Sequence, residues 1–160
     1  MFTVVDLFCG AGGFSRGFEE AGFDIALGLE NLEPVAETYM ENFPEAEVIV
    51  EDIQRVRAEE IERLIGKPDV IIGGPPCEPF TKANPKRKEN PLDRLYEDPI
   101  GRLVLYFIRM VGDLKPKVFV MENVPGMAST LYNGGNLADH IVSFARKLDY
   151  NAEWRILDAS

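Results

Sequence analysis

The sequence has few cysteines and no long hydrophobic run. Its two cysteines, Cys9 and Cys77, stand in unrelated local sequences, which argues against a disulfide framework or a zinc site and suits a reducing compartment. The longest apolar runs, such as Val118 to Met121, are far too short to cross a bilayer, and the N-terminus lacks a basic region followed by an apolar stretch. We therefore expect a soluble, cytoplasmic protein with no metal site and no membrane contact.

Basic residues are also scarce. The chain has 17 Lys and Arg against 27 Asp and Glu, which gives a formal net charge of −10. Strong binding along a nucleic-acid backbone requires clustered Lys and Arg, because it is driven by the release of counterions. The composition therefore argues against a surface that wraps nucleic acid by itself, and any such contact must be local or supplied by a partner.

The apolar content is sufficient for one core. Hydrophobic residues make up 46% of the 160 residues, which favours a single domain over residues 1–160. Short β-rich runs alternate with helical patterns, and repeated strand-helix-strand units predict an α/β fold with a doubly wound, mostly parallel sheet. The predicted strands are Thr3–Leu7, Ile25–Leu29, Val48–Val50, Val70–Ile72 and Val118–Met121, and the predicted helices are Phe14–Ala21, Pro34–Asn42, Ala58–Ile65, Gly101–Leu114 and Leu137–Leu148.

Some segments depart from this rhythm. The first, fourth and fifth predicted strands lack in-out alternation, which predicts that they are buried on both faces. Glu78 to Pro99 has four prolines and no periodicity, and a structureless stretch of that length is usually functional or disordered. Glu153 to Ala159 is typical of one more strand, with nothing after it to pair with or cover it. The fold is therefore expected to be incomplete at its C-terminus.

Glycines and carboxylates follow the first three predicted strands, at the sheet edge where such folds bind ligands. Asp6 to Gly13 (DLFCGAGG) is a strand-to-helix turn whose glycines allow a ligand to approach the backbone near a helix N-terminus. Glu30 could accept hydrogen bonds from both hydroxyls of a ribose, and Asp52 one from an exocyclic amine. Each feature alone could be an ordinary turn or surface carboxylate, but together they indicate a nucleoside pocket. Ser15 departs from the dinucleotide fingerprint, which disfavours a nicotinamide-binding domain.

Candidate catalytic residues follow the fourth and fifth predicted strands. Two prolines stiffen the backbone just before Cys77, and a cysteine nucleophile needs an electropositive neighbourhood or a proton acceptor. Glu122 and Asn123 are expected beside it, because the two strands should be neighbours. A carboxylic acid there could protonate a substrate ring. Taken alone, Cys77 could instead be an inert buried thiol and Glu122 a strand-end carboxylate bonded to backbone amides.

Three motifs in register link these positions to a known family. DLFCGAGGFSRGF (Asp6–Phe18), PPCEPF (Pro75–Phe80) and ENVPG (Glu122–Gly126) resemble the cytosine-5 DNA methyltransferase family in order and spacing. The resemblance covers nearly the whole chain and implies a Rossmann-like, S-adenosylmethionine-dependent methyltransferase fold. Weaker blocks that are similar to the same family are Glu30 with Thr38-Tyr39 and Asn42, Glu51–Ile53, Asp98–Arg102 and Lys115–Phe119.

The resemblance implies a role for each candidate residue. Cys77 would attack carbon 6 of a cytosine flipped out of duplex DNA, while Glu122 engages ring nitrogen 3 and the amino group, so that carbon 5 can take the methyl group. The turn around Phe8 would hold the methionine part of S-adenosylmethionine, Glu30 the ribose, and Asp52 with Ile53 the adenine. The full set of implied cofactor-binding residues is Asp6, Phe8, Gly10, Ala11, Gly12, Gly13, Phe14, Glu30, Asn31, Asp52, Ile53, Pro75 and Pro76, and Asn123 joins the catalytic pair.

The segment Glu78 to Pro99 would then be a loop that closes over the flipped base. Its basic residues would contact phosphates: Lys82, Lys86, Arg87 and Lys88. Glu78 departs from the family, most of whose members have glutamine there, and it adds negative charge beside the thiolate.

The family's later blocks have no counterpart in the chain. These blocks are an arginine-bearing motif, the target-recognition region and a C-terminal motif that completes the cofactor site. The chain is therefore expected to be one subunit of a split enzyme, joined by a second polypeptide, or a truncated form, with restriction-modification as one setting. Two alternatives stay open: methylation of cytosine in transfer RNA, and an inactive cofactor-binding subunit or remnant.

Overall fold

The computed structural model describes residues 1–81, 83–132 and 135–158, and the chain forms two compact units. The first unit comprises residues 1–75 and 109–122, and the second comprises residues 76–108 and 123–160. Lys82, one of the predicted basic contacts, lies outside the described residues.

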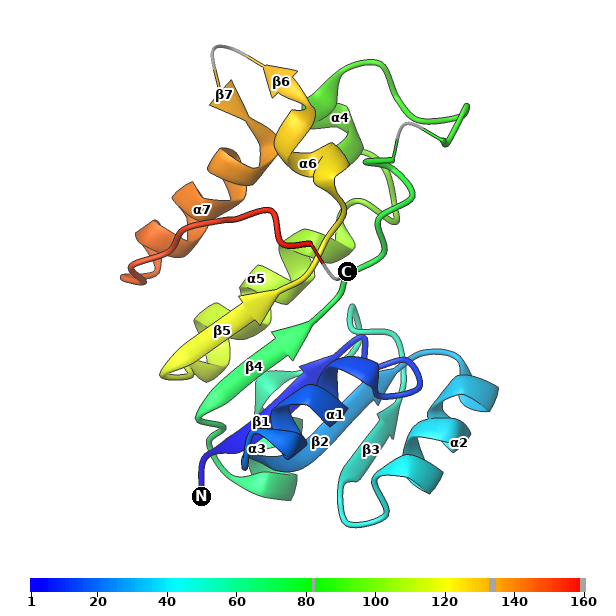
Figure 1. Cartoon of the computed structure of the whole chain (residues 1–160), viewed down its shortest axis with the longest axis vertical. Coiled ribbons are helices and arrows are strands. Elements are labelled where there is room, and N and C mark those ends of the chain that lie inside the picture. Colours follow the sequence, from blue (N-terminus) through cyan, green and yellow to red (C-terminus); the bar gives the residue numbers. More distant parts are fainter. Residues whose placement is uncertain (82, 133–134, 159–160) are drawn as a thin grey trace. The chain divides into compact units, whose positions relative to one another are not determined.

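The first unit is built on a five-stranded sheet in the order β3-β2-β1-β4-β5 (Figure 1). Every pairing in it is parallel, so the carboxyl ends of all the strands meet at one edge. The doubly wound, mostly parallel α/β fold is confirmed, and so is the prediction that the fourth and fifth strands are neighbours. The strands are β1 (Thr3–Leu7), β2 (Asp24–Glu30), β3 (Glu47–Val50), β4 (Val70–Gly73) and β5 (Val118–Met121).

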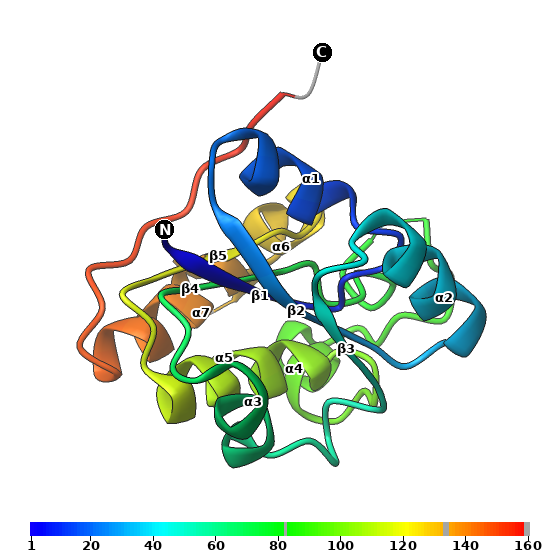
Figure 2. The same cartoon turned by 90° about the horizontal axis from the view of Figure 1, so that it is seen from below.

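Helices cover both faces of this sheet. Figure 2 shows α1 on one side of the strands and α3 on the other. Helix α1 begins directly after Gly12, which has a φ of 95°, and Gly66, which has a φ of 74°, directly follows the end of α3. The ends of the predicted helices differ from the observed ones by at most two residues, and Ala58–Ile65 matches at both ends. The helices of the first unit are α1 (Gly13–Glu20), α2 (Glu33–Asn42), α3 (Ala58–Ile65) and the part of α5 (Leu103–Leu114) that begins at Arg109.

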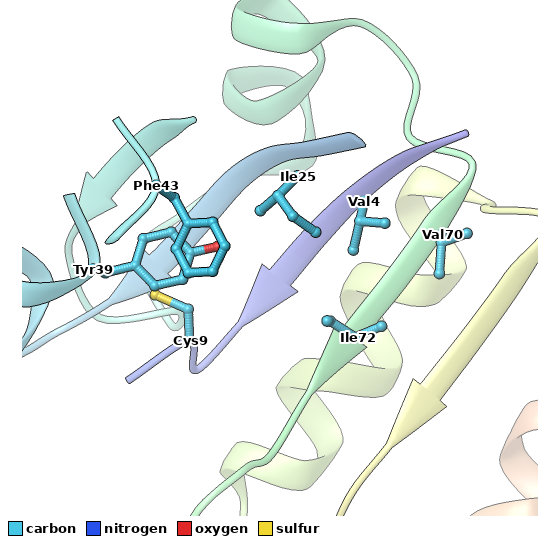
Figure 3. Packing of buried hydrophobic residues seen from close by; sticks show 7 residues of the cluster. All are labelled: Val4, Cys9, Ile25, Tyr39, Phe43, Val70 and Ile72. Atoms are coloured by element: carbon cyan, nitrogen blue, oxygen red, sulfur yellow. The ribbon is translucent and has the colours of Figure 1, made fainter. Parts of the chain in front are cut away.

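The core on the α1 side of the sheet joins strand residues to an aromatic pair (Figure 3). The Tyr39 and Phe43 rings lie 4.7 Å apart between centroids. Gly28 of β2 leaves room for Tyr39 and Cys9, because a Cβ there would lie 2.5 Å from the Tyr39 ring and 2.9 Å from the Cys9 sulfur. Fully burying a large apolar side chain stabilises the fold by about 1.5–3 kcal/mol. This packing therefore anchors the carboxyl ends of β1 and β2, where the predicted site begins.

Strand β5 is more exposed than its neighbours. Val118 is 52% exposed and Val120 39%, although their partners in β4, Val70 and Ile72, are buried. The prediction that this strand is buried on both faces is wrong. A short apolar run does not show whether another element covers the face of the strand on which Val118 and Val120 both lie.

The second unit contains helices and a short antiparallel pair. Helix α4 corrects the prediction that Glu78 to Pro99 is structureless. Asn90 caps this helix by accepting a hydrogen bond from the Leu92 amide at 3.1 Å, and Pro91 occupies its first turn. Six residues are too few to show a helical period. The elements of this unit are α4 (Pro91–Tyr96), the start of α5, α6 (Pro125–Ser129), β6 (Leu131–Tyr132), β7 (Gly135–Asn136) and α7 (Leu137–Lys147).

The last described residues form no strand. Glu153 to Asp158 have no regular structure, so the predicted strand from Glu153 to Ala159 is wrong over its described part. Trp154 instead donates a hydrogen bond from its ring nitrogen to Asp139 at 2.8 Å. A β-rich run becomes a strand only when another strand satisfies its backbone groups.

In the part of the chain that the structure describes, no helix is long and apolar enough to cross a membrane.

Candidate functional site

The turn between β1 and α1 has a backbone that favours glycine. Gly10 and Gly12 have φ values of 56° and 95°, and Phe8 also has a positive φ of 67°. A Cβ on Gly12 would lie 2.2 Å from the Phe43 ring, whereas Gly10 and Gly13 face open space. Among the residues that the structure describes, no side chain caps the first turn of α1. A ligand can therefore approach this backbone closely at the N-terminus of the helix.

A buried carboxyl group lies below this turn. Asp6 is 1% exposed, and its Oδ2 accepts a hydrogen bond from the Ser15 hydroxyl at 2.6 Å. The same hydroxyl lies 2.8 Å from the Tyr39 hydroxyl, while Oδ1 of Asp6 has no hydrogen-bond partner in the described part of the chain. Burial raises the pKa of Asp6 to about 6, although the hydrogen bonds from Ser15 lower it. Burial likewise raises the pKa of Cys9 and of Tyr39.

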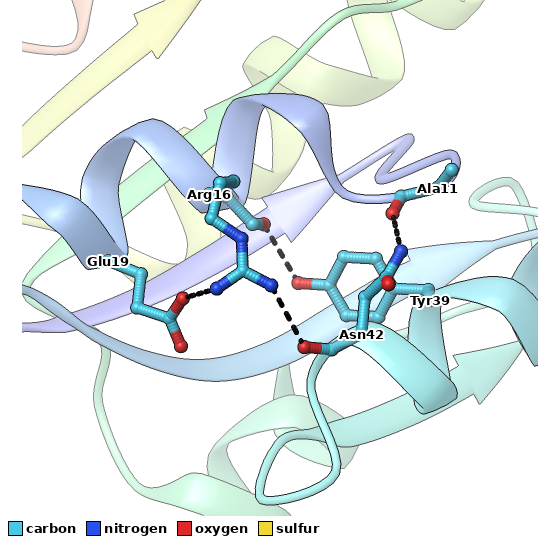
Figure 4. A network of polar contacts seen from close by, with 6 residues as sticks. Ala11, Arg16, Glu19, Tyr39 and Asn42 are labelled. Atoms are coloured by element: carbon cyan, nitrogen blue, oxygen red, sulfur yellow. Dashed lines mark hydrogen bonds and ion pairs between the residues drawn. The ribbon is translucent and has the colours of Figure 1, made fainter.

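A second group of contacts ties the turn to α2 (Figure 4). The side-chain amide of Asn42 donates to the carbonyl of Ala11 at 2.8 Å. The Arg16 guanidinium donates to the Asn42 carbonyl at 3.3 Å and also pairs with Glu19. The end of α2 therefore fixes the turn between its two positive-φ glycines.

Glu30, at the end of β2, is bonded to three backbone amides. Its Oε2 accepts from Gly10 at 3.1 Å, and its Oε1 accepts from Asn31 at 2.9 Å and from Leu32 at 3.0 Å. Each carboxylate oxygen has about two acceptor sites, so Oε1 is fully used and Oε2 retains capacity for one hydroxyl donor. Glu30 thus supports the glycine turn and remains chemically suited to bind a ribose.

Asp52 follows β3 and is held in a compact turn. Its Oδ1 accepts from the Gln54 amide at 2.9 Å, and its Oδ2 accepts from the Gln54 side chain at 3.2 Å. Ile53 is 3% exposed, so its side chain belongs to the core and its backbone faces the turn. The Asp52 carboxylate is half-buried at the sheet edge, where it can accept a further hydrogen bond.

The ends of β4 and β5 lie side by side in the first unit. The Glu122 amide donates to the Gly73 carbonyl at 3.0 Å. A Cβ on Gly74 would lie 3.2 Å from Oε2 of Glu122, so the absence of a side chain there leaves room for this carboxylate. Glu122 is exposed and Pro75 is buried. The Glu122 carboxylate is therefore accessible at the same edge as Asp52 and the glycine turn.

Cys77 lies near the start of the second unit. It is half-buried, and its carbonyl accepts hydrogen bonds from Phe80 at 2.9 Å and from Thr81 at 3.2 Å. Phe80 is fully buried, and a Cβ on Gly126 would lie 2.2 Å from its carbonyl oxygen. The turn that carries Cys77 is thus packed against the segment after Asn123, whose Oδ1 accepts from the next amide at 3.0 Å.

The predicted basic residues differ from one another in exposure and in their partners. Lys86 is exposed and Arg87 is half-buried, whereas Lys88 lies 2.9 Å from Glu97, a hydrogen bond that raises the pKa of the ammonium group. Arg94 is 6% exposed and donates to the Lys88 carbonyl at 2.5 Å. A phosphate would therefore have to compete with Glu97 for Lys88.

The predicted residues fall into two groups. The first unit brings the glycine turn, Glu30, Asp52 and Glu122 to the carboxyl edge of one sheet. Cys77 and Asn123 belong to the second unit, so the pairing of Cys77 with Glu122 stays a prediction. In the described part of the chain, no group of His, Cys, Asp or Glu could hold a metal ion.

Sequence reasoning did not identify the residues that support the site. Ser15 was noted only as a departure from a dinucleotide pattern, and Tyr39 and Asn42 only as parts of a weaker family block. Arg109 was not noted, although it is a single charged residue within the apolar first eight residues of α5 (LVLYFIRM). That isolated charge is the one signal that could have drawn attention to it.

Comparisons with known proteins point to one family. A family model described as "C-5 cytosine-specific DNA methylase" matches residues 2–160. A protein of Methanocaldococcus jannaschii, provisionally named a type II methyltransferase, is 52% identical over 77% of the chain and 41% of its own length. A type II methyltransferase of Haemophilus parahaemolyticus is 37% identical over 99% of the chain and 41% of its own length.

A solved structure shares the fold. This protein, encoded within an Escherichia coli prophage and provisionally described as a DNA modification methyltransferase, superposes with a TM-score of 0.70 at 31% identity. The match covers 92% of the chain and 38% of that protein. The chain therefore spans about two fifths of the length of these relatives.

Proposed function

Because the chain belongs to the C-5 cytosine-specific DNA methylase family, we propose that it binds S-adenosylmethionine and carries the catalytic residues that methylate carbon 5 of cytosine in DNA. The observation that supports this most strongly is the arrangement of the first unit, where the glycine turn, Glu30, Asp52 and Glu122 all follow parallel strands at one edge. This is the edge where doubly wound folds bind nucleotides.

The residues of the first unit fit the cofactor. Open space over Gly10 and Gly13 leaves the backbone accessible at the N-terminus of α1, which suits a carboxylate. Oε2 of Glu30 offers an acceptor for a ribose hydroxyl. Oδ1 of Asp6, which has no hydrogen-bond partner among the described residues, is an acceptor that a water or an amine could satisfy. When bound, S-adenosylmethionine would supply an electrophilic methyl group.

The chain's own residues would make carbon 5 of cytosine reactive toward the methyl group. Carbon 5 of cytosine is a poor nucleophile, and addition of the Cys77 thiolate to carbon 6 would make it electron-rich. Glu122 would engage ring nitrogen 3 and the amino group, with Asn123 completing the catalytic set. After methyl transfer, removal of the proton on carbon 5 would expel Cys77 and restore the ring.

The segment from Glu78 to Pro99 is proposed as the loop that closes over the flipped base. Its support is the position directly after Cys77 together with the basic residues Lys86, Arg87 and Lys88. Glu78 places a negative charge where most of the family has glutamine, so we expect the Glu78→Gln variant to bind DNA more tightly, which a DNA titration at fixed salt measures.

We propose that a second polypeptide supplies the target-recognition region. The chain matches about two fifths of the length of these relatives, and the remaining parts of those proteins have no counterpart in the sequence. Purification of the tagged chain from its native host, followed by mass spectrometry, tests this. A co-purifying protein that restores sequence-specific methylation would support the proposal, whereas a longer form of this chain that acts alone would contradict it.

The activity itself is tested with a labelled methyl group. The purified protein, with any partner, is incubated with labelled S-adenosylmethionine and either duplex DNA or transfer RNA. We expect label in DNA cytosine, lost at least ~10³-fold in Cys77→Ser and retained in Cys9→Ala, whose thiol is buried in the core. Label in transfer RNA alone would replace the proposed substrate. Cofactor binding without transfer to either acceptor would leave only a cofactor-binding subunit.

A further inference from the structure

Arg109 connects helix α5 to the turn that follows β3. One nitrogen of its guanidinium, Nη2, donates to the carbonyl of Ile53 at 2.9 Å and to the carbonyl of Val56 at 3.0 Å. An Nη group carries two hydrogens, so one nitrogen can bridge two carbonyls and set the distance between them. The residues that meet are 56 and 53 positions apart in the sequence.

The segment that Arg109 contacts is otherwise held by local bonds and by burial. Asp52 accepts both hydrogen bonds from Gln54, and the Arg55 amide donates to the Asp52 carbonyl at 2.8 Å. Ile53 and Val56 are only 3% and 2% exposed. The side chains therefore fix the apolar side of the turn, and Arg109 fixes the direction of its carbonyls. That direction determines where the Asp52 carboxylate and the Ile53 backbone point.

We propose that Arg109 is a positioning residue for adenine recognition by Asp52 and Ile53. This inference rests on the proposed function, because it takes those two residues as the adenine contacts. Hydrogen bonds from a charged donor are stronger than neutral ones. The part-buried guanidinium therefore holds the turn ready for the cofactor, and without it two carbonyls lose their donor.

The first test measures S-adenosylhomocysteine binding to the full chain by calorimetry. Arg109→Met retains an unbranched apolar side chain and removes the guanidinium, and it should weaken binding about 10- to 100-fold at unchanged stoichiometry. Arg109→Lys should lose less, because an ammonium can still reach one carbonyl. Arg63→Met, an exposed change on α3, is the matched control and should bind like the unmodified chain. A reduced stoichiometry with an unchanged Kd would show a purely structural role and overturn the inference.

The second test asks whether the effect concerns adenine itself. S-inosylhomocysteine replaces the exocyclic amine by an oxygen, so a correctly placed Asp52 should discriminate against it. The preference for the adenosyl compound should shrink at least fivefold in Arg109→Met and stay unchanged in Arg63→Met. Equal discrimination by Arg109→Met and the unmodified chain would overturn the inference, even if Arg109→Met binds both compounds more weakly.

A third measurement separates this inference from the proposed function. If the unmodified chain binds neither compound, the proposed function fails, and hydrogen exchange of the amides from Ile53 to Arg57 then decides the role of Arg109. These amides should exchange at least tenfold faster in Arg109→Met than in the Arg63→Met control. Unchanged exchange would show that Arg109 does not hold the turn.

Discussion

The glycine turn of the first unit and the segment after Cys77 in the second unit are held by different kinds of contact. The turn is fixed along its length by the Glu30 carboxylate, by the Asn42 amide and by packing of Phe43 against Gly12. These contacts come from two elements, β2 and the end of α2. The turn is therefore held in one conformation before any ligand binds.

The first part of the segment after Cys77, from Glu78 to Glu89, is held near its two ends. Phe80 packs against Gly126 at the start, and Arg94 donates to the carbonyls of Lys88 and Glu89 at the far end. Between them, the contacts are local turns such as that of Asn84, which accepts from the Lys86 amide at 2.9 Å. The difference matches the proposed roles, because a cofactor pocket benefits from pre-organisation and a closing loop must be able to open.

The largest effect is expected at Gly12, where the turn has no room for a side chain. Gly12→Ala combines a positive φ with a Cβ that would lie 2.2 Å from the Phe43 ring, and it should lower the free energy of unfolding by about 4 kcal/mol. Gly13→Ala is the matched control, because open space surrounds it and alanine favours a helix. Urea unfolding of both variants measures the difference. Similar stabilities would show that the turn is as adaptable as the segment after Cys77.

The buried Asp6 network should give the first unit a specific pH dependence. Because burial raises the pKa of Asp6 to about 6, the folded state binds its proton more tightly than the unfolded state. Stability should therefore fall as pH rises from about 4 to about 6 and then level off, by up to about 3 kcal/mol relative to Asp6→Asn. Urea unfolding of the unmodified chain and of Asp6→Asn across this pH range measures the difference in stability. Asp24→Asn, a change at an exposed carboxylate, is the control. A pH-independent difference would contradict the prediction.

Loss of Arg94 should loosen the segment after Cys77 and leave the glycine turn of the first unit unchanged. Arg94→Met leaves the carbonyls of Lys88 and Glu89 without their donor, so local opening should become about 2 kcal/mol easier. Limited proteolysis within residues 83–90 should then be about 10- to 30-fold faster, whereas cleavage in the first unit should not change. Arg102→Met, an exposed change in the same unit, serves as the reference. Equal cleavage rates would mean that other contacts hold this segment.

The smallest effect is expected at Lys88. Its ammonium group is exposed and paired with Glu97, so Lys88→Met should leave the melting temperature unchanged. If the loop contacts phosphates, the same change should lower DNA affinity at all sequences and reduce the slope of log affinity against log salt by about one. Lys67→Met, an exposed lysine of the first unit, provides the comparison. An unchanged salt slope would remove Lys88 from the DNA interface.

Much of the fold could be predicted because it depends on local patterns. Apolar runs, glycines after helices and proline at a first turn placed the long elements within one or two residues. Helix α4 was missed, since six residues show no period and its cap is formed by one side chain, Asn90. The strand expected after Glu153 was wrong, because strand formation depends on a partner that composition does not reveal.

The site divides in the same way. Its strand-end positions followed from the sequence, because glycine turns and carboxylates after predicted parallel strands must gather at one edge. The supporting residues could not be predicted, since each acts through a distant partner. Tyr39 approaches Ser15 across 24 residues, Asn42 approaches Ala11 across 31, and Arg109 approaches Ile53 across 56.

The sequence by itself determined the order of the five sheet strands and the longer helices along the chain, the family, and the residue types at each strand end. Only the tertiary structure decided which side chains hold those ends in place, that Asp6 is buried beside Ser15, and that one face of β5 is open. The physical reason is that residue types and their periods act over a few neighbours. Burial and long-range hydrogen bonds depend instead on how strands pair and on which helices cover them.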